Sequence, residues 1–163
     1  MNVIVAVDKN WAIGHNNRLL TRIPGDLKNF RRMTLGKVIV MGRKTLESFP
    51  GGQPLEKRVN IVLTTNRAYQ AKGVVLVHTM EQLAEKLEEY QSDDIFIIGG
   101  GSVYKQLLPQ CKTAYITKIN HAYQADTWFP NLDEEASWQQ VEEGEEQTCF
   151  DLEYHFTRYE RKE

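Results

Sequence analysis

The segment Ile95-Phe96-Ile97-Ile98-Gly99-Gly100-Gly101-Ser102-Val103-Tyr104 is the clearest indication of how this chain folds. It opens with four consecutive β-branched or aromatic residues, which is typical of a strand buried on both faces of a parallel sheet. Three glycines follow, and the apolar spacing beyond them predicts a helix that Ser102 caps and Pro109 ends. A buried strand, a turn and a helix form the repeating unit of an α/β domain.

The three glycines allow two interpretations. They can form a tight turn between strand and helix, because glycine adopts backbone dihedrals that other residues avoid. They can also leave the backbone bare for a flat or phosphorylated ligand, which in open α/β sheets binds beyond the carboxyl ends of the strands. The dinucleotide fingerprint of the Rossmann fold is excluded, because its sixth position is Tyr104 here and the segment lies late in the chain.

Strands and helices alternate along most of the chain. Further buried strands are predicted at residues 3–7, 38–41, 59–63, 74–77 and 114–119. Helices are predicted after Pro24, from Gly42 through Phe49, and after a capping box formed by Thr79 and Gln82. A long polar loop at residues 11–24, with an Asn16-Asn17 pair, is expected to be a functional lid or a disordered segment.

The end of the chain has a different pattern. From Phe150 to Thr157, apolar and polar residues alternate, which predicts a strand with one face in water. Together with the segment around Trp138 and Val141, it predicts an antiparallel hairpin. The expected fold class is therefore α/β: a single domain with a mostly parallel central sheet, flanking helices and a C-terminal antiparallel hairpin at the edge.

Composition narrows the class of protein further. A chain of 163 residues suffices for one domain, expected to span residues 1–163, and its net charge of −2 gives no reason to expect nucleic acid or a membrane as partner. The sequence has no basic, hydrophobic leader and no apolar run that could span a bilayer. Cys111 and Cys149 are expected to be buried thiols in a reducing compartment, so the chain is expected to be cytoplasmic.

Three predicted strands end in residues suited to a ligand: Gly42-Arg43-Lys44-Thr45, Thr64-Thr65-Asn66-Arg67 and the three glycines. Each segment alone is explained by helix capping and solvated surface charge. Together, hydroxyls, cations and bare backbone fit a dinucleotide laid across the edge of the sheet, with the cations indicating an additional phosphate.

Asp26, near the start of a predicted helix, is the candidate acid. The simplest role for an aspartate there is to cap the helix or to interact with its dipole. Val5, Ala6, Leu27 and Phe30 would, however, surround it with apolar groups suited to a flat ring, and burial would then raise its pKa. The histidines at 15, 78, 121 and 155 lack the spacing of metal ligands and are expected on the surface or in loops, and no metal site is expected.

With these residues in view, the chain resembles bacterial-type dihydrofolate reductases over essentially its whole length. Each motif is weak alone, but the ordered set at matching spacing is specific. The matching segments are Ile13-Gly14, Ile23-Pro24-Gly25-Asp26-Leu27, Val40-Met41-Gly42-Arg43-Lys44-Thr45, Glu47-Ser48, Arg58-Val59-Asn60-Ile61-Val62-Leu63, Ile98-Gly99-Gly100-Gly101-Ser102-Val103-Tyr104, and Asp126-Thr127 before Phe129-Pro130.

The resemblance implies hydride transfer from NADPH to 7,8-dihydrofolate, giving the tetrahydrofolate used in one-carbon metabolism and in thymidylate, purine and amino-acid synthesis. It implies that Asp26 binds the pterin 2-amino and N3 groups in a paired hydrogen bond and favours N5 protonation, with the proton coming from water. It also implies that antifolate inhibitors bind, and we expect a monomer.

The resemblance assigns further site residues by position. The pterin pocket is assigned to Ile4, Val5, Ala6, Leu27, Phe30, Ile98 and Thr117, and the benzoyl and glutamate contacts to Phe49, Leu55 and Arg58, with Arg58 holding the α-carboxylate. The cofactor is assigned to Ala6, Ile13, Gly14, Gly42, Arg43, Lys44, Thr45, Leu63, Thr64, Thr65, His78, Ile98, Gly99, Gly100, Gly101, Ser102, Val103, Tyr104 and Thr127.

The sequence departs from the family pattern in the lid. Leu20 and Thr21 stand where the family commonly has Pro-Trp, and Ala125 stands where a glycine often precedes Asp126. Two alternatives therefore stay open besides dihydrofolate reductase. One is a pyrimidine reductase of riboflavin synthesis, against which the positions of Asp26 and Arg58 argue. The other is a catalytically silent module that binds the cofactor.

Overall fold

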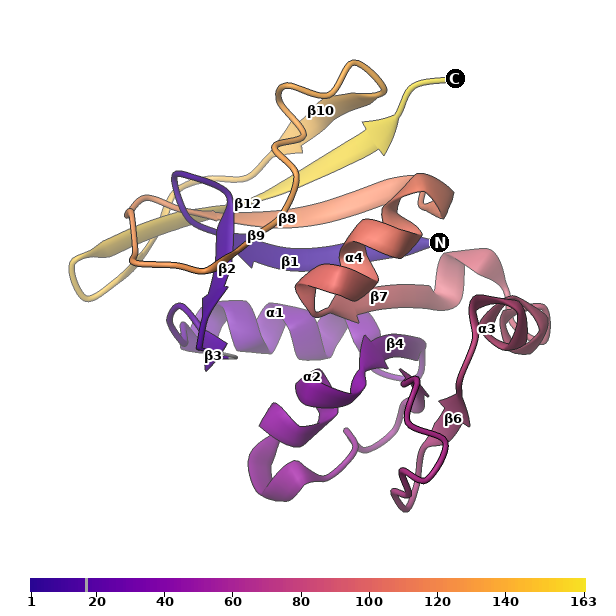
Figure 1. Ribbon diagram of the computed structural model, residues 1–163. Coiled ribbons are helices and arrows are strands. Elements are labelled where there is room, and N and C mark those ends of the chain that lie inside the picture. Colours follow the sequence, from indigo (N-terminus) through magenta and orange to yellow (C-terminus); the bar gives the residue numbers. More distant parts are fainter. Residues whose placement is uncertain (17) are drawn as a thin grey trace.

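The apolar runs of the sequence form one large sheet in the computed structural model, which describes residues 1–16 and 18–163 (Figure 1). Within the described residues the sheet has nine strands, in the order β10-β12-β8-β1-β7-β4-β5-β6, with β11 paired to β12. The strands are β1 (Asn2–Val7), β4 (Val38–Gly42), β5 (Val59–Leu63), β6 (Val75–Val77), β7 (Ile95–Gly99), β8 (Thr113–Ile119), β10 (Trp138–Glu143), β11 (Gln147–Cys149) and β12 (Leu152–Arg161).

Six consecutive strands of this sheet are parallel to one another: β6, β5, β4, β7, β1 and β8. Their carboxyl ends therefore lie along one edge of the sheet. Strand β12 runs antiparallel to β8 and pairs Phe156 with Thr117, and β10 runs antiparallel to β12. The predicted mostly parallel sheet with an antiparallel edge is therefore confirmed.

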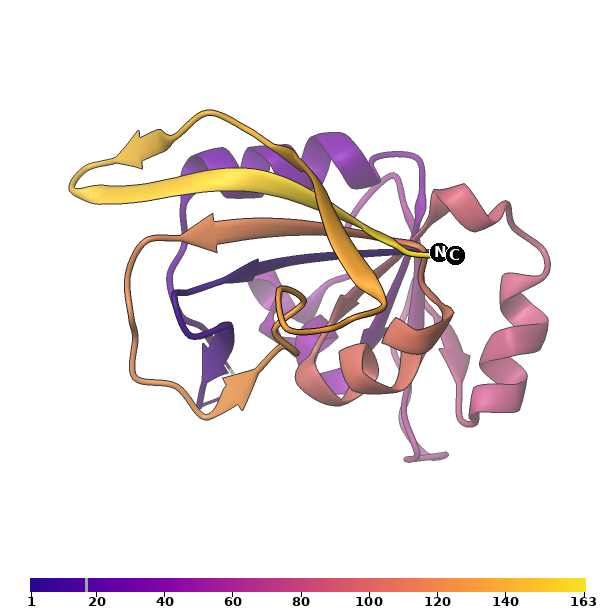
Figure 2. The ribbon, with the colours of Figure 1, turned by 90° about the horizontal axis from the view of Figure 1, so that it is seen from above.

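Helices cover both faces of this sheet, and Figure 2 shows α1 and α4 on opposite sides. Apolar residues of α1 (Pro24–Thr34) and α2 (Arg43–Ser48) pack on one face, around Ile39 and Met41. Those of α3 (Met80–Leu87) and α4 (Gly101–Leu107) pack on the other, around Val40 and Ile97. Short 3₁₀ turns lie at Pro50–Gly52, Ser92–Asp94 and Leu108–Gln110.

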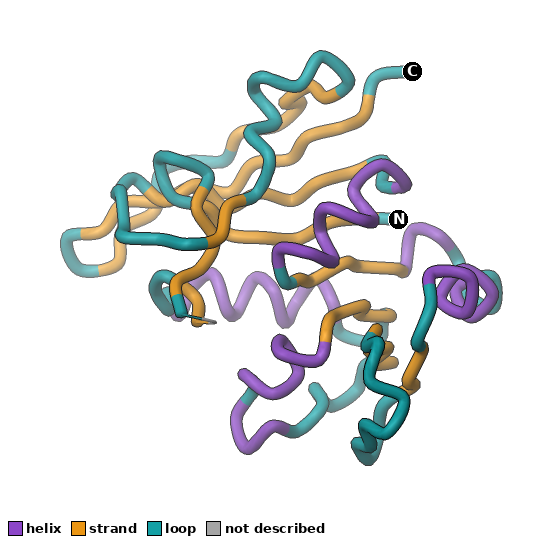
Figure 3. Tube along the Cα trace, viewed as in Figure 1, coloured by secondary structure: helices purple, strands orange, loops and turns teal. Residues whose placement is uncertain are grey.

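The long loop predicted at residues 11–24 contains regular structure. Strands β2 (Ala12–His15) and β3 (Arg18–Leu19) form a hairpin, and β2 also pairs with β9 (Thr127–Trp128) (Figure 3). Asn17 lies outside the described residues. These strands could not be predicted from the polar sequence, because strands of two to four residues need no hydrophobic run.

Three local predictions are wrong. Helix α4 begins at Gly101 with Gly100 as its N-cap, and the Ser102 hydroxyl accepts from Gln106 Nε2 (3.0 Å) instead of capping. The last strand begins at Leu152, because Phe150 adopts a φ of 55° in the β11–β12 turn and is 97% exposed. Cys111 is buried as expected, but Cys149 is only half-buried.

The capping box is half confirmed. The Gln82 backbone N–H donates to Thr79 Oγ1 (3.0 Å), as expected, but Gln82 Oε1 accepts from the His78 backbone N–H (2.7 Å). Among the described helices, none is long and apolar enough to cross a membrane.

Candidate active site

Asp26 lies in the first turn of α1, which begins with Pro24 at a position where the missing N–H costs nothing. Its Oδ1 accepts a hydrogen bond from the Thr117 hydroxyl of β8 (2.7 Å). Within the described chain, no side chain caps α1, so helix capping does not explain this aspartate. Burial raises the pKa of Asp26, and the hydrogen bond from Thr117 opposes that shift. The arrangement is typical of a functional carboxyl group.

Strand β1 supplies the apolar surface beside this carboxyl group. Ala6 pairs with Thr117, so the carboxyl end of β1 lies directly next to the residue that binds Asp26. The Tyr104 hydroxyl donates to the Ile4 carbonyl (2.8 Å), and burial raises the pKa of this phenol. The Tyr104 bond thus joins α4 to β1, and the Asp26–Thr117 bond joins α1 to β8, the strand beside β1.

The second wall comes from α1 and the segments that follow β4. Phe30, Phe49 and Leu55 are half-buried on one apolar cluster, whereas Leu27 is 42% exposed. The Arg58 guanidinium lies 6.0 Å from the centre of the Phe30 ring. A flat ring bound beside Asp26 would therefore contact these apolar side chains, with the Arg58 guanidinium beyond Phe30.

Arg58 is fixed by a residue that the sequence did not reveal. Thr34 is fully buried; its hydroxyl donates to the Phe30 carbonyl (2.8 Å) and accepts from Arg58 Nε (2.9 Å). Burial lowers the pKa of Arg58, as does the nearby charge of Arg31, but a guanidinium stays charged at neutral pH. Arg58 thus keeps its charge and one orientation. A threonine at the end of a helix carries no signal of this role.

The three ligand-like segments do meet at one edge. They follow β7, β4 and β5, which are neighbours in the sheet. Gly99 has a φ of +115°, and a Cβ there would lie 3.0 Å from the Tyr104 ring. A Cβ at Gly100 would point at the Thr45 hydroxyl, 3.7 Å away, and would narrow the space between the glycine turn and α2. The turn interpretation is thus supported at Gly99, whose positive φ suits glycine, and the role of the glycines toward a ligand stays a prediction.

These residues fit a phosphorylated dinucleotide. Arg43 and Thr45 lie on α2, and Thr64 and Thr65 follow β5, so two hydroxyl-bearing segments and a cation share the edge with the bare glycine turn. Thr64 is buried and its hydroxyl accepts from the Asn66 N–H (3.2 Å), whereas Thr65 is exposed. The remaining assigned residues of this group, Gly42, Lys44, Leu63, Ile98, Ser102 and Val103, lie on the same strand ends and helix starts.

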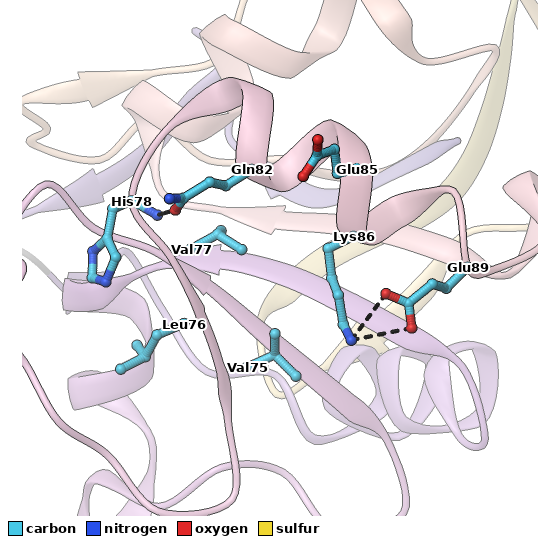
Figure 4. Close-up of a pocket in the computed structure, with 8 residues that line it drawn as sticks. All are labelled: Val75, Leu76, Val77, His78, Gln82, Glu85, Lys86 and Glu89. Atoms are coloured by element: carbon cyan, nitrogen blue, oxygen red, sulfur yellow. Dashed lines mark hydrogen bonds and ion pairs between the residues drawn. The ribbon is translucent and has the colours of Figure 1, made fainter.

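His78 joins this edge from β6. Its Nδ1 lies 2.8 Å from the Thr64 carbonyl oxygen, and the ring is half-buried. Figure 4 shows His78 at one end of a groove between β6 and α3, where the Lys86–Glu89 ion pair borders the other end. The histidine that the resemblance assigned to the cofactor therefore does lie beside Thr64.

The small sheet β3-β2-β9 is held against the glycine turn. A Cβ at Gly101 would lie 2.6 Å from Thr127 Cγ2, so the two segments touch. The Asp126 backbone N–H donates to the Gly14 carbonyl (3.0 Å), and its carboxylate accepts from the Asn16 N–H (2.9 Å) and the Thr127 hydroxyl (2.9 Å). These bonds lower the pKa of Asp126, so it remains ionised. Thr127 is thereby placed next to Gly101, and Gly14 lies next to Thr127.

The described residues contain no group of three or more His, Cys, Asp or Glu side chains arranged to hold a metal ion. Thr21 and Leu20, where the sequence departs from the family pattern, are both half-buried in the lid. The ring of Trp11, the first residue of the predicted loop, packs 6.3 Å from Phe129 and 6.0 Å from Tyr159, centre to centre. The candidate site therefore consists of Asp26, two apolar walls, Arg58 and a sheet edge whose residues suit a phosphorylated ligand.

Comparison with known proteins agrees with this geometry. The family model "Dihydrofolate reductase" matches residues 1–161. A dihydrofolate reductase of Bacillus subtilis (strain 168) is 35% identical over 99% of this chain and 95% of its own length. One from Haemophilus influenzae is 36% identical over 94% of each chain. The solved structure of dihydrofolate reductase from Enterococcus faecalis complexed with NADP(H) and RAB-propyl superposes with a TM-score of 0.87, at 32% identity, covering 99% of this chain and 96% of that one. The chain therefore belongs to the dihydrofolate reductase family, whose members reduce dihydrofolate to tetrahydrofolate with NADPH.

Proposed function

We propose that this chain reduces 7,8-dihydrofolate to 5,6,7,8-tetrahydrofolate, with Asp26 as its catalytic residue. The observation that carries the proposal is the buried Asp26 carboxyl group, bonded to Thr117 at 2.7 Å and placed at the same sheet edge as the glycine turn. NADPH, when bound, supplies the hydride that C6 of the pterin receives.

Asp26 orients the pterin and makes its N5 easier to protonate. One carboxylate can accept two parallel hydrogen bonds, here from the 2-amino group and N3 of the pterin. Its negative charge, held in an apolar pocket, stabilises the positive charge that N5 protonation creates. Thr117 fixes the carboxyl group in this orientation. Water provides the proton, and the apolar walls limit how much water reaches the ring.

The remaining roles follow from position. Ile4, Val5, Ala6, Leu27, Phe30 and Ile98 contact the pterin, and Phe49 and Leu55 contact the benzoyl group. Arg58 binds the α-carboxylate of the glutamate through its planar fork, because Thr34 holds its Nε. Arg43, Thr45, Thr64 and Thr65 bind the cofactor phosphates, and Ala6 and Ile13 bind the nicotinamide amide, beside Tyr104.

We also propose that the protein is one domain, acts as a monomer and works in the cytoplasm. Every residue of the site comes from a single chain, and the free thiols Cys111 and Cys149 suit a reducing compartment. Antifolate inhibitors that mimic the pterin should bind at Asp26. Size-exclusion chromatography tests the oligomeric state directly.

The assay is to mix the protein with NADPH and dihydrofolate and to follow NADPH absorbance. We expect oxidation that needs both compounds and that an antifolate blocks. Replacing dihydrofolate with the aminopyrimidine substrate of riboflavin synthesis serves as the control for the alternative reductase. Binding of NADPH without oxidation in either mixture would contradict the proposal and would identify a silent cofactor-binding module.

A further inference from the structure

Arg43, the first residue of α2, has a partner on its own helix. Its Nη1 donates to both carboxylate oxygens of Glu47, at 3.0 Å and 3.4 Å. Both side chains are partly exposed, at 39% for Arg43 and 46% for Glu47. Because the pair faces solvent at the sheet edge, the guanidinium can exchange partners when a stronger anion arrives.

The guanidinium of Arg43 also lies over the ring of Tyr69, which belongs to the loop after β5. The centre of the Tyr69 ring is 5.9 Å from the Arg43 guanidinium carbon, within the range of a cation–π contact. The ring also packs on the apolar cluster that includes Leu46 of α2, which limits its movement.

The loop that carries Tyr69 is shaped by its own side chains. The Thr64 hydroxyl accepts from the Asn66 N–H (3.2 Å), and Asn66 Oδ1 accepts from the Ala68 N–H (3.0 Å). The Tyr69 N–H then donates to the Asn66 carbonyl (3.2 Å). These bonds turn the chain directly after β5 and return Tyr69 toward α2. The loop therefore links Thr64, on the cofactor edge, to the ring beside Arg43.

We propose that Tyr69 and Glu47 set the preference for a phosphorylated over an unphosphorylated nicotinamide dinucleotide, acting through Arg43. Tyr69 is a positioning residue that holds the guanidinium without adding charge. Glu47 holds the same guanidinium through its carboxylate and therefore competes with a negatively charged ribose phosphate for Arg43. Lys44, on α2, and Arg67, in the loop that carries Tyr69, are exposed cations. Their positive charge attracts a phosphate independently of Tyr69 and Glu47. This inference rests on the proposed role of Arg43 toward the cofactor phosphate.

The test is equilibrium binding of NADPH and NADH, followed by fluorescence in the absence of dihydrofolate. Glu47→Gln should lower the Kd for NADPH by about two- to fivefold, the range of an exposed ion pair, and leave NADH unchanged. Tyr69→Leu should raise the Kd for NADPH by about two- to fivefold, the range of an exposed cation–π contact, while Tyr69→Phe keeps the ring and the wild-type value.

The matched control is the same pair of substitutions in an Arg43→Ala background. Arg43→Ala alone should weaken NADPH far more than NADH, and adding Glu47→Gln or Tyr69→Leu should then change nothing, because the residue they act through is gone. Circular dichroism confirms that each variant is folded.

Three results would overturn the inference: a higher NADPH Kd in Glu47→Gln, equal shifts for NADH, or effects that persist without Arg43. The readout is binding, so it separates this inference from the proposed function. Failure to oxidise NADPH with dihydrofolate contradicts the proposed function only, whereas failure to bind NADPH contradicts both.

Discussion

The buried Asp26 carboxyl group lowers the free energy of unfolding of the protein at neutral pH, where it has to be ionised. Burial raises its pKa in the folded state above the ordinary value of an aspartate, so the unfolded chain releases this proton more readily. The free energy of unfolding therefore falls as pH rises from the unfolded pKa through the folded one. This cost is absent at low pH, where both states are protonated, and is fully present at neutral pH.

Asp26→Asn should consequently make the protein without ligand more stable at neutral pH. The amide has a similar shape, can still accept from the Thr117 hydroxyl and carries no charge to desolvate. We expect a gain of about 1 kcal/mol, or about 2–4 °C in Tm for a chain of this size. Thermal melts at neutral pH and near pH 4 test this: the gain should shrink in acid, and a lower Tm at neutral pH would contradict it.

A residue that would act on the substrate was easier to predict from the sequence than a residue that holds such a side chain in position. Asp26 could be singled out because a carboxylate near several apolar residues is unusual, and the structure shows it bonded to Thr117 and its pKa raised by burial. Thr34 could not be, because its role depends on Arg58 arriving from a distant segment. The assignments of Arg43, Arg58 and the other contact residues to particular ligand groups stay predictions.

At the scale of elements, the lid sheet β3-β2-β9 and the glycine turn depend on each other through one contact. Thr127 Cγ2 occupies the space that a side chain at Gly101 would need. The same threonine donates to Asp126, which binds the Asn16 N–H of the β2–β3 hairpin. The glycine at the start of α4 therefore fixes where the lid rests.

Gly101→Ala should destabilise the protein by about 1–3 kcal/mol, the usual cost of overpacking, and should weaken NADPH binding. Thr127→Ser in the same background should restore most of both losses, because serine lacks Cγ2 but keeps the hydroxyl that donates to Asp126. Chemical denaturation and NADPH titration of the two single variants and the double variant measure the coupling. If the effects of the two single substitutions simply added in the double variant, the contact between residues 101 and 127 would not be the cause of the losses.

Thr21→Trp tests the unusual lid sequence. Thr21 is half-buried, and Trp11 does not fill space in the lid because its ring packs on Phe129 and Tyr159. We therefore expect a lower KM for dihydrofolate, by about two- to tenfold if the new ring gains ~0.5–1.5 kcal/mol of aromatic contact. The KM for NADPH should not change. A lower Tm with an unchanged or higher dihydrofolate KM would show that the pocket has no room.

Elements with a strong hydrophobic period were predictable, and those set by tertiary contacts were not. The buried strands could be predicted from continuous apolar runs such as Val38–Met41. The strands β2, β3 and β9 exist because they pair with one another, which no local pattern reveals. The alternating pattern placed Phe150 in a strand. In the structure, however, Phe150 lies in the two-residue turn between β11 and β12, with a positive φ.

At the scale of the whole molecule, ligand binding and folding should be coupled. The cofactor edge is assembled from β4, β5, β6 and β7 and the helices after them, so it exists only when the sheet is complete. The order of the strands could not be predicted from periodicity. The alternation of strands and helices predicted a mostly parallel sheet with an antiparallel edge, but it did not show which strands are neighbours.

NADPH at 100 times its Kd should raise the free energy of unfolding by about 2.7 kcal/mol, since it binds only the folded state. If the chain is a single cooperative domain, one transition should shift as a whole, with circular dichroism and fluorescence giving the same midpoint. NADH at the same concentration should give a smaller shift. Two separate transitions, with one insensitive to NADPH, would contradict the proposed single domain.

The most direct test of the central claim compares wild type with Asp26→Asn in NADPH oxidation by dihydrofolate, from neutral to mildly acidic pH. The amide cannot stabilise a protonated pterin, so we predict a loss of about 10²–10⁴-fold at neutral pH with the NADPH Kd unchanged. The loss should shrink in acid, where solvent protonates the substrate beforehand. Full activity of Asp26→Asn at neutral pH would contradict the claim that Asp26 is the catalytic residue.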